Sequence, residues 1–190
     1  LTRLRQACCH PRLILGQQEE LTSSKLRTFL ELALDLRAGD HRCLVFSQFT
    51  RLLDLLEAQL EQHSLSYLRL DGSTPASQRG ALVREFQKGQ TDLFLISLKA
   101  GGTGLNLTAA DYVVHLDPWW NPAVEDQASD RVHRLGQERP VTVYRLVARG
   151  TLEEKVLRMH QGKRQLAEQM LAGSEIAQTI SEQDLRDLLS

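Results

Sequence analysis

Short apolar runs alternate with amphipathic segments through the middle of the chain. Five runs of strand length are rich in bulky or β-branched apolar residues, at 42–47, 67–70, 93–97, 112–116 and 141–147. Several of these runs are apolar almost without interruption, which is typical of strands that are covered on both faces. Because helix-like segments lie between them, the pattern predicts an α/β fold, a doubly wound and mainly parallel sheet flanked by helices.

Capping signals mark where these helices are expected to begin. The expected N-caps are Thr50, Thr74 before Pro75, Asn121 before Pro122, and Thr151. Leucines recur at helical spacing in 50–62, which supports the first of these helices. The run TLEE at 151–154 is a capping box, in which a threonine and a glutamate three residues later satisfy each other's backbone N–H groups.

Helical appendages flank the predicted sheet on both sides. The expected units are a helical lead-in (1–38), a sheet domain (39–150), and brace and tail helices (151–190). The lead-in is interrupted between Pro11 and Ser24. We expect the apolar stripe of the helix after Thr151 to pack back on the sheet, and a second short helix, capped at Ser181, to end the chain.

Composition narrows the class of protein. Apolar residues make up 42% and charged residues 25% of the chain, which is ordinary for a globular protein and not for a disordered one. Cys8, Cys9 and Cys43 form no even framework, so we expect a reducing compartment. Neither His133 nor the run Cys8-Cys9-His10 has partners at metal-ligand spacing, and no metal site is expected. No apolar run reaches the roughly 18 residues that cross a bilayer.

Charge is unevenly distributed although the net charge is only −1. Residues 131–164 hold nine Lys and Arg against three acids, whereas 165–190 hold five acids against Arg186. A local positive field acts within roughly 10 Å at ordinary salt, whatever the total charge is. The pattern fits an anion-binding surface and equally a solvated helix face. The chain begins without methionine and shows no signal-peptide pattern, so we expect it to be a segment of a longer protein.

Three loops follow predicted strand ends, where ligands of open α/β sheets bind. They lie at 47–49, 97–106 and 117–122. In the second loop, KAGGTGLN offers backbone N–H groups that can surround an anion. It has neither the lysine of a Walker A loop nor the glycine spacing of a dinucleotide fingerprint, and a simple tight turn explains its glycines as well.

The third loop, DPWWNP, carries two adjacent tryptophans. An exposed tryptophan is costly in water and often marks an interface. Against nucleic acid it stacks on a base or wedges against the sugar–phosphate backbone. The alternative is that both side chains brace the loop against the helix that follows.

The stretch EDQASDRVHRLGQ, at 125–137, predicts a short polar helix. Arg131 and Arg134 are three residues apart and therefore share a face, with Gln127 one turn earlier. Two guanidinium groups match phosphate oxygens and can neutralise the charge of a transferring phosphoryl group. The alternative is a surface helix whose arginines pair with the neighbouring aspartates.

Over nearly its whole length the chain resembles the second, C-terminal RecA-like lobe of Swi/Snf-family ATP-dependent DNA translocases, in helicase superfamily two. The matching stretches are LRQACCHPRL (4–13), SSKL (23–26), LVFSQFT (44–50), LRLDGST (68–74), FLISLKAGGTGLNLTAAD (94–111), VVHLDPWWNPAVEDQASDRVHRLGQ (113–137) and VYRLVARGTLEEKV (143–156). The acidic ending ISEQDLRDLL resembles bacterial members, so we expect a bacterial protein with a native C-terminus.

The resemblance implies roles for individual residues. Arg131 and Arg134 match arginine fingers that reach across the cleft between two lobes to the γ-phosphate of ATP, and Gln127 matches a glutamine that helps to order that cleft. The loop beside the nucleotide corresponds to Gly102, Gly104 and Asn106. The motifs that grip one DNA strand contain Ser47, Gln48, Gly72, Ser97, Lys99, Thr108 and Trp120. The helix from Thr151 resembles the brace that crosses back to the first lobe.

The resemblance also implies cofactors, partners and a cellular location. ATP with Mg²⁺ would be bound mainly by the N-terminal lobe, so this lobe alone is expected to lack ATPase activity. The expected partners are double-stranded DNA, the N-terminal RecA-like lobe of the same protein and a DNA-bound protein complex, with no membrane. A bacterial protein would be cytoplasmic and nucleoid-associated, and a eukaryotic one nuclear.

Two other classes of function stay open. One is a stand-alone nucleotide-binding α/β domain that uses the glycine-rich loop. The other is a non-catalytic interaction module whose arginine helix binds an acidic protein. Affinity for ATP in the absence of any other lobe would distinguish the first of these from a translocase lobe.

Overall fold

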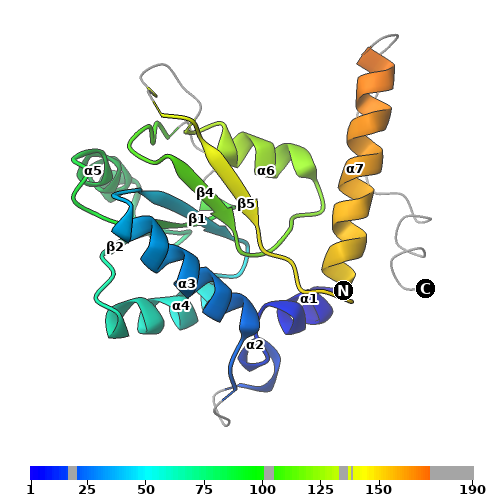
Figure 1. Ribbon diagram of the computed structural model, residues 1–190, viewed down its shortest axis with the longest axis horizontal. Coiled ribbons are helices and arrows are strands. Elements are labelled where there is room, and N and C mark those ends of the chain that lie inside the picture. Colours follow the sequence, from blue (N-terminus) through cyan, green and yellow to red (C-terminus); the bar gives the residue numbers. More distant parts are fainter. Residues whose placement is uncertain (17–20, 101–104, 133–136, 138, 172–190) are drawn as a thin grey trace.

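The computed structural model describes residues 1–16, 21–100, 105–132, 137 and 139–171, with side chains as far as Gln161. Five parallel strands form one sheet in the order β2-β3-β1-β4-β5 (Figure 1). The strands are β1 (Cys43–Ser47), β2 (Tyr67–Leu70), β3 (Leu93–Ser97), β4 (Tyr112–His115) and β5 (Thr142–Arg145). The predicted doubly wound parallel sheet is confirmed, and each predicted strand is present.

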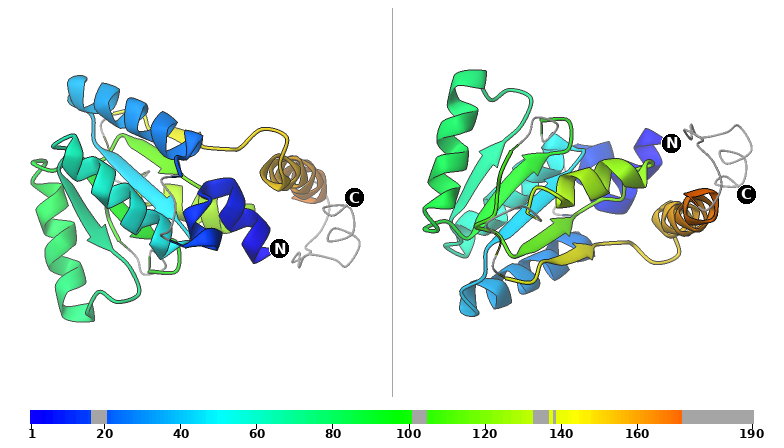
Figure 2. Two further views of the ribbon diagram at one scale, coloured as in Figure 1. Left: turned by 90° about the horizontal axis from the view of Figure 1, so that it is seen from below. Right: turned by 90° about the horizontal axis from the view of Figure 1, so that it is seen from above.

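Helices cover both faces of this sheet (Figure 2). They are α1 (Thr2–Cys9), α2 (Arg12–Leu15), α3 (Ser24–Ala38), α4 (Thr50–Gln62), α5 (Ala76–Gln87), α6 (Pro122–Ser129) and α7 (Leu152–Leu171). One core joins α3 and α4 to the face that carries Cys43 and Val45, and a second joins α5 and α6 to the face that carries Leu44 and Phe46. Because side chains alternate along β1, this fully buried central strand contributes to both cores.

Two of the predicted helix starts are capped as expected. The Asn121 side chain accepts a hydrogen bond from an N–H group in the first turn of α6, at 3.1 Å. At α7, the Thr151 hydroxyl accepts from the N–H of Glu153 at 3.2 Å. Both halves of the predicted capping box are shifted by one residue, since Thr151 accepts from Glu153 instead of Glu154 and the Glu154 carboxylate accepts from the N–H of Gly150, at 3.1 Å, instead of Thr151.

The other two predicted caps are wrong. Thr50 is already the first residue of α4, and the N-cap is Phe49, whose N–H group donates to the Ser47 hydroxyl at 3.0 Å. Thr74 lies outside α5, and its hydroxyl accepts from the N–H of Asp71 at 3.0 Å. In both loops a hydroxyl satisfies a backbone group of the turn rather than of the helix, which is the competing use of serine and threonine side chains.

Helix α7 stands apart from the sheet (Figure 1), and its first turns lie against α1. The prediction that its apolar stripe packs back on the sheet is therefore wrong for the described part of the helix. The cause lies at its start, where the buried Glu153 is paired with Lys25 of α3 and fixes the direction in which the helix leaves. Among the described helices, none has the length and apolar composition of a membrane-spanning segment. The helix predicted at Ser181 lies outside the described residues.

Candidate functional site

Four loops of the predicted site meet at the carboxyl edge of the sheet. β1 ends at Ser47 and β3 at Ser97, and these two residues lie side by side in the register of the sheet. The neighbouring strand β2 leads directly into the turn at Gly72, and β4 leads into the loop from Asp117 to Trp120. Because all strands are parallel, these loops open toward the same side, as predicted for the loops that follow β1, β3 and β4.

Asp117 is a buried residue that connects two of these loops by hydrogen bonds, with 1% of its surface exposed. Its carboxylate accepts from the Ser47 hydroxyl at 2.5 Å, from the Gln48 backbone N–H at 3.3 Å and from the Gln48 side-chain amide. Burial raises the pKa of Asp117, although these hydrogen bonds and the cations Lys25 and Arg5 act in the opposite direction. The sequence reading did not single out Asp117, whose only local signal is an acid directly after an apolar strand.

Ser47 and Ser97 lie in the interior, with 0% and 3% exposure. The Ser97 hydroxyl accepts from the N–H of Ala100 at 3.3 Å, and the Gln48 amide is held by Asp117. In this conformation Ser47 and Ser97 do not offer their hydroxyl groups to solvent, and Gln48 is half-buried with its amide nitrogen engaged by Asp117. Their contact with DNA stays a prediction.

The turn at Gly72 and the side chain of Lys99 are exposed at the same edge. No heavy atom lies within 4 Å of the point where a Cβ on Gly72 would stand, so the space before this turn is open. Asp71 orders the turn by accepting from the N–H and hydroxyl of Ser73, at 2.8 and 2.6 Å, and from Arg69 at 2.8 Å. The hydrogen bond from the Ser73 hydroxyl is the largest cause of the lowered pKa of Asp71.

Both tryptophans of the third loop are half-buried. The backbone N–H of Trp119 donates to the Glu125 carboxylate of α6 at 2.7 Å, which fastens the loop to the helix through the backbone and not through the side chains of the bracing alternative. The ring centroids of Trp119 and Trp120 lie 5.5 and 4.9 Å from the guanidinium carbon of Arg5. The loop is therefore held from α1 as well as from α6.

Asn106 and Thr108 lie near the start of β4 and not with the other strand-end residues. Gln87, at the end of α5, donates to the Asn106 carbonyl at 2.9 Å and to the Thr108 hydroxyl at 3.3 Å. Gln137 donates to the Thr108 carbonyl at 3.1 Å. The structure therefore does not bring Thr108 together with the predicted DNA contacts at the carboxyl edge, while the Asn106 side chain is exposed.

Helix α6 ends at Ser129, so Arg131 follows it in a turn and does not lie on the helix. Arg131 is only 3% exposed, and its carbonyl accepts from the N–H of Leu107 at 3.2 Å. The prediction that Arg131 lies on an exposed helical face is wrong, because this contact with the loop before β4 replaces a further helical turn. Gln127 is exposed on α6. Arg134, Gly102 and Gly104 lie outside the described residues.

The described residues do not fit a bound metal ion. No group of three His, Cys, Asp or Glu side chains is placed to hold one within the part of the chain that the structure describes. Asp117, the acid at the end of β4, is engaged by hydrogen bonds from Ser47 and Gln48. Mg²⁺ therefore finds no carboxylate cluster among the described residues of this lobe.

A buried ion pair anchors the start of α7, and sequence reasoning missed it. Lys25 Nζ lies 2.6 Å from both carboxylate oxygens of Glu153, and the two side chains are 4% and 2% exposed. Glu153 also accepts from the N–H of Ala148 at 2.9 Å and from the Cys9 thiol at 3.7 Å. Lys25 and Glu153 each lie in a stretch that carries the resemblance, but no local pattern indicates that they are partners.

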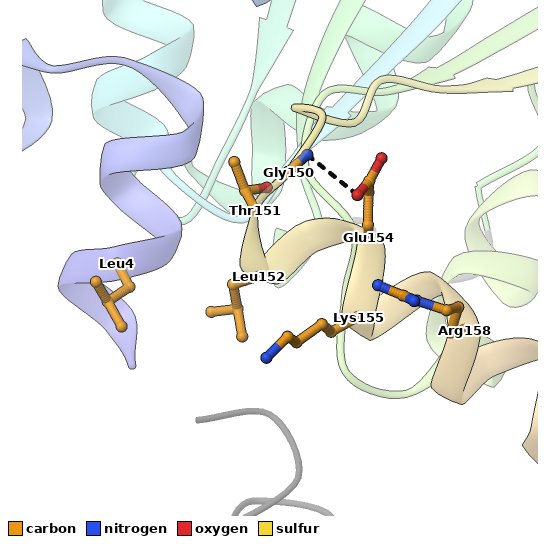
Figure 3. A pocket seen from close by; sticks show the side chains of 7 residues that line it. All are labelled: Leu4, Gly150, Thr151, Leu152, Glu154, Lys155 and Arg158. Carbon is orange, nitrogen blue, oxygen red and sulfur yellow. Dashed lines mark hydrogen bonds between the residues drawn. The ribbon is translucent and has the colours of Figure 1, made fainter. Parts of the chain in front are cut away.

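Beside this anchor a groove of about 390 Å³ opens between α1 and α7 (Figure 3). It is lined by Leu4, Gly150, Thr151, Leu152, Glu154, Lys155 and Arg158. Figure 3 shows Leu4 of α1 across the groove from the first turns of α7. None of these residues belongs to the predicted site.

Comparison with known proteins agrees with the fold. Residues 24–136 match the family described as the helicase conserved C-terminal domain. The chain is 42% identical over 195 residues to YwqA of Bacillus subtilis, which carries the name ATP-dependent helicase/translocase, with all of this chain and 21% of that protein covered. It is 44% identical over 158 residues to the chromatin-remodeling ATPase INO80 of Schizosaccharomyces pombe, with 83% of this chain and 10% of that protein covered.

A solved structure gives the same result. The crystal structure of the C-terminal part of the Fun30 ATPase domain superposes with a TM-score of 0.72 and 32% identity, over 99% of this chain and 61% of that one. The chain spans 21% or less of the length of the two curated relatives above. It belongs to the helicase conserved C-terminal domain family, as a RecA-like lobe of the Swi/Snf type.

Proposed function

We propose that this chain is the C-terminal motor lobe of an ATP-dependent double-stranded DNA translocase and works with an N-terminal RecA-like lobe of the same protein. Its relatives carry the names of an ATP-dependent helicase/translocase and a chromatin-remodeling ATPase. The observation that supports a DNA-binding role best is the meeting of four strand-end loops at one edge, where the Gly72 turn and Lys99 are accessible. In this role the edge grips one strand of the duplex.

The first DNA contacts would come from Gly72, Lys99 and Trp120. An open glycine turn lets phosphate oxygens approach backbone N–H groups, and an ammonium group adds attraction that does not depend on sequence. A tryptophan at the same edge offers a ring for stacking. The polar side chains of Ser47 and Gln48 are bound to Asp117 here, so direct contacts from them would follow only a rearrangement of these hydrogen bonds.

Arg131 and Arg134 would complete an ATP site whose phosphate cradle and Mg²⁺ ligands lie in the N-terminal lobe. A guanidinium group is suited to stabilise charge on a phosphoryl group. Since Arg131 is only 3% exposed, this role requires the turn after α6 to change when the two lobes close. Gln127, which is exposed on α6, would help to order the cleft, with Asn106 and the glycine loop beside the nucleotide.

A protein that contains both lobes tests the arginine assignment. We expect Arg131→Ala and Arg134→Ala to bind nucleotide about as tightly as the parent protein and to lose about 10³-fold or more of the DNA-stimulated ATP turnover. Arg84→Ala, at an exposed position of α5, serves as the control and should turn over ATP normally. Normal turnover in either finger variant would show that the assignment of that arginine is wrong.

The 190-residue chain alone is expected to bind DNA weakly and to hydrolyse no ATP. Calorimetry with ATP separates this proposal from a stand-alone nucleotide-binding domain, which would bind without the other lobe. An interaction module would instead bind an acidic protein in a salt-sensitive way, and its arginine variants would keep full ATPase activity in the two-lobe protein.

A further inference from the structure

Arg5 of α1 is a buried arginine, 6% exposed, that reaches the tryptophan loop. Its Nη2 group donates to the Pro118 carbonyl at 2.7 Å. Its guanidinium carbon lies 4.9 Å from the ring centroid of Trp120, 5.5 Å from that of Trp119 and 5.8 Å from that of Phe49. One side chain thus contacts three aromatic rings and the backbone beside two of them.

Burying this guanidinium group is costly. Desolvation lowers the pKa of Arg5, and among the described residues no carboxylate forms an ion pair with it. Asp117 and Glu153 attract the charge only from farther away. An apolar side chain of similar length would fill the space without this cost. Unlike an apolar side chain, the arginine makes contacts that depend on geometry. Its hydrogen bond and its cation–π contacts form only while the Pro118 carbonyl and the aromatic rings keep this arrangement.

The loops that Arg5 touches are the same two that Asp117 joins. Phe49 follows Gln48 after β1, and the tryptophans follow Asp117 after β4. Asp117 connects these loops through hydrogen bonds and Arg5 connects them through ring contacts, so two different interactions fix one arrangement. The other end of α1 is fixed as well, since the Cys9 thiol donates to Glu153 at 3.7 Å.

We propose that Arg5 is a positioning residue that holds Trp119 and Trp120 at the carboxyl edge, which makes α1 part of the DNA-binding site. The link to DNA rests on the proposed function, whereas the positioning of the loop does not.

Tryptophan fluorescence tests the positioning directly. Trp119 and Trp120 are the two tryptophans of the sequence, so the emission reports on this loop alone. We expect Arg5→Met to raise the acrylamide quenching constant about two-fold or more and to shift the emission to longer wavelength, because the loop loses its cationic partner. Arg5→Lys should give an intermediate value, since it keeps the charge without the planar fork. Arg3→Met, exposed on the same helix, is the control.

Circular dichroism establishes whether each variant is folded. Quenching equal to that of the parent chain in a folded Arg5→Met variant would overturn the proposal. If Arg5→Met does not fold, Arg5→Lys decides, since raised quenching supports the positioning role and unchanged quenching overturns it.

Titration with duplex DNA separates this inference from the function on which it rests. If the proposed function holds, DNA changes the emission of the parent chain, and Arg5→Lys, which keeps the charge, weakens DNA binding about three-fold. If DNA changes nothing in the parent chain, the proposed function fails while the quenching data still decide the role of Arg5. If quenching rises but DNA affinity is unchanged, Arg5 positions a loop that does not serve DNA binding, and that half of the proposal is overturned.

Discussion

The two ends of strand β4 each carry a buried aspartate, and the surroundings of the two are opposite in kind. Asp111, at the amino end, accepts from His41 at 2.7 Å, from the backbone of Arg42 at 3.1 Å and from Arg139 at 3.2 Å. Burial alone would raise its pKa, but these hydrogen bonds outweigh burial and the pKa of Asp111 is lowered. At the carboxyl end burial prevails, and the pKa of Asp117 is raised.

Both aspartates are shielded from solvent, since Asp111 and Asp117 are 3% and 1% exposed, but Asp117 lies deeper in the protein and its partners are also of a different kind. Basic residues contact the first carboxylate directly, whereas the hydrogen bonds to the second come from Ser47 and Gln48. The ionised form of Asp111 is therefore stabilised at the amino edge of the sheet, whereas the ionised form of Asp117 is disfavoured at the carboxyl edge. Imperfectly compensated buried groups are common at functional edges, and here they lie where the DNA-binding loops are proposed.

We expect the largest change in the free energy of unfolding when the buried ion pair of Lys25 and Glu153, at the carboxyl edge, is broken. Lys25→Met leaves a buried carboxylate without its cation, so the free energy of unfolding should fall by about 3–5 kcal/mol. Lys88→Met is a matched control because Lys88 pairs with Glu85 at the surface, and it should cost about 0.5 kcal/mol or less. Urea unfolding measures both. Equal losses would show that the ion pair does not anchor α7.

A second large effect should appear with pH at His115, the last residue of β4. Its ring is fully buried, lies 3.1 Å from the Ser129 hydroxyl and stacks on Phe46. Burial lowers the pKa of His115 to about 4. Because the unfolded chain takes up this proton near pH 6.5, the free energy of unfolding should fall by about 3 kcal/mol between pH 6.5 and 4.

The measurement compares the pH dependence of two histidine variants. His115→Gln should lose about 3 kcal/mol less than the parent chain between pH 7 and 4, since it removes the group that titrates. His63→Gln, at an exposed position after α4, should keep the dependence of the parent chain. If His115→Gln and the parent chain respond equally to pH, the ring is not held neutral by burial.

The sequence predicts the sheet well because the patterns that indicate strands and helix caps involve residues that are neighbours in the chain. Each strand of four or five residues lies within one of the predicted apolar runs, and the Asn121 cap depends on contacts within one turn. The direction of α7 was not predictable in this way, because it depends on Lys25 and Glu153, which are 128 positions apart. Periodicity identifies the face of an element that is buried but not the distant side chain that meets it.

In the candidate site, too, some features follow from the local sequence and others depend on contacts between distant residues. The resemblance identifies Arg131 by its motif, but this residue is buried where the turn after α6 meets the loop before β4, a contact between distant segments that no spacing indicates. Arg5 and Asp117 were not singled out, since their partners come from other loops. A motif gives the kind of residue at a position, and tertiary contacts decide whether its side chain is accessible.

The smallest effect compares the two aspartates of β4 directly. Replacement by asparagine removes the charge and keeps the shape of the side chain. Asp111→Asn loses charge-assisted contacts with His41 and Arg139, so we expect a cost of about 1–2 kcal/mol at pH 7. Asp117→Asn should cost about 1 kcal/mol or less, because burial already disfavours the charge and the Gln48 amide can turn to present its oxygen.

The pH dependence of the two variants should also differ in sign. The lowered pKa of Asp111 stabilises the fold above the ordinary aspartate pKa of about 3.9, and that contribution is lost as the pH falls through its folded value. The raised pKa of Asp117 acts the other way, so its charge opposes folding at neutral pH and the opposition fades on acidification. Urea unfolding of Asp111→Asn and Asp117→Asn at pH 7 and below about pH 3, where the contribution of Asp111 is being lost, measures both signs. A larger cost for Asp117→Asn at pH 7 would mean that the carboxyl edge stabilises its charge as firmly as the amino edge does.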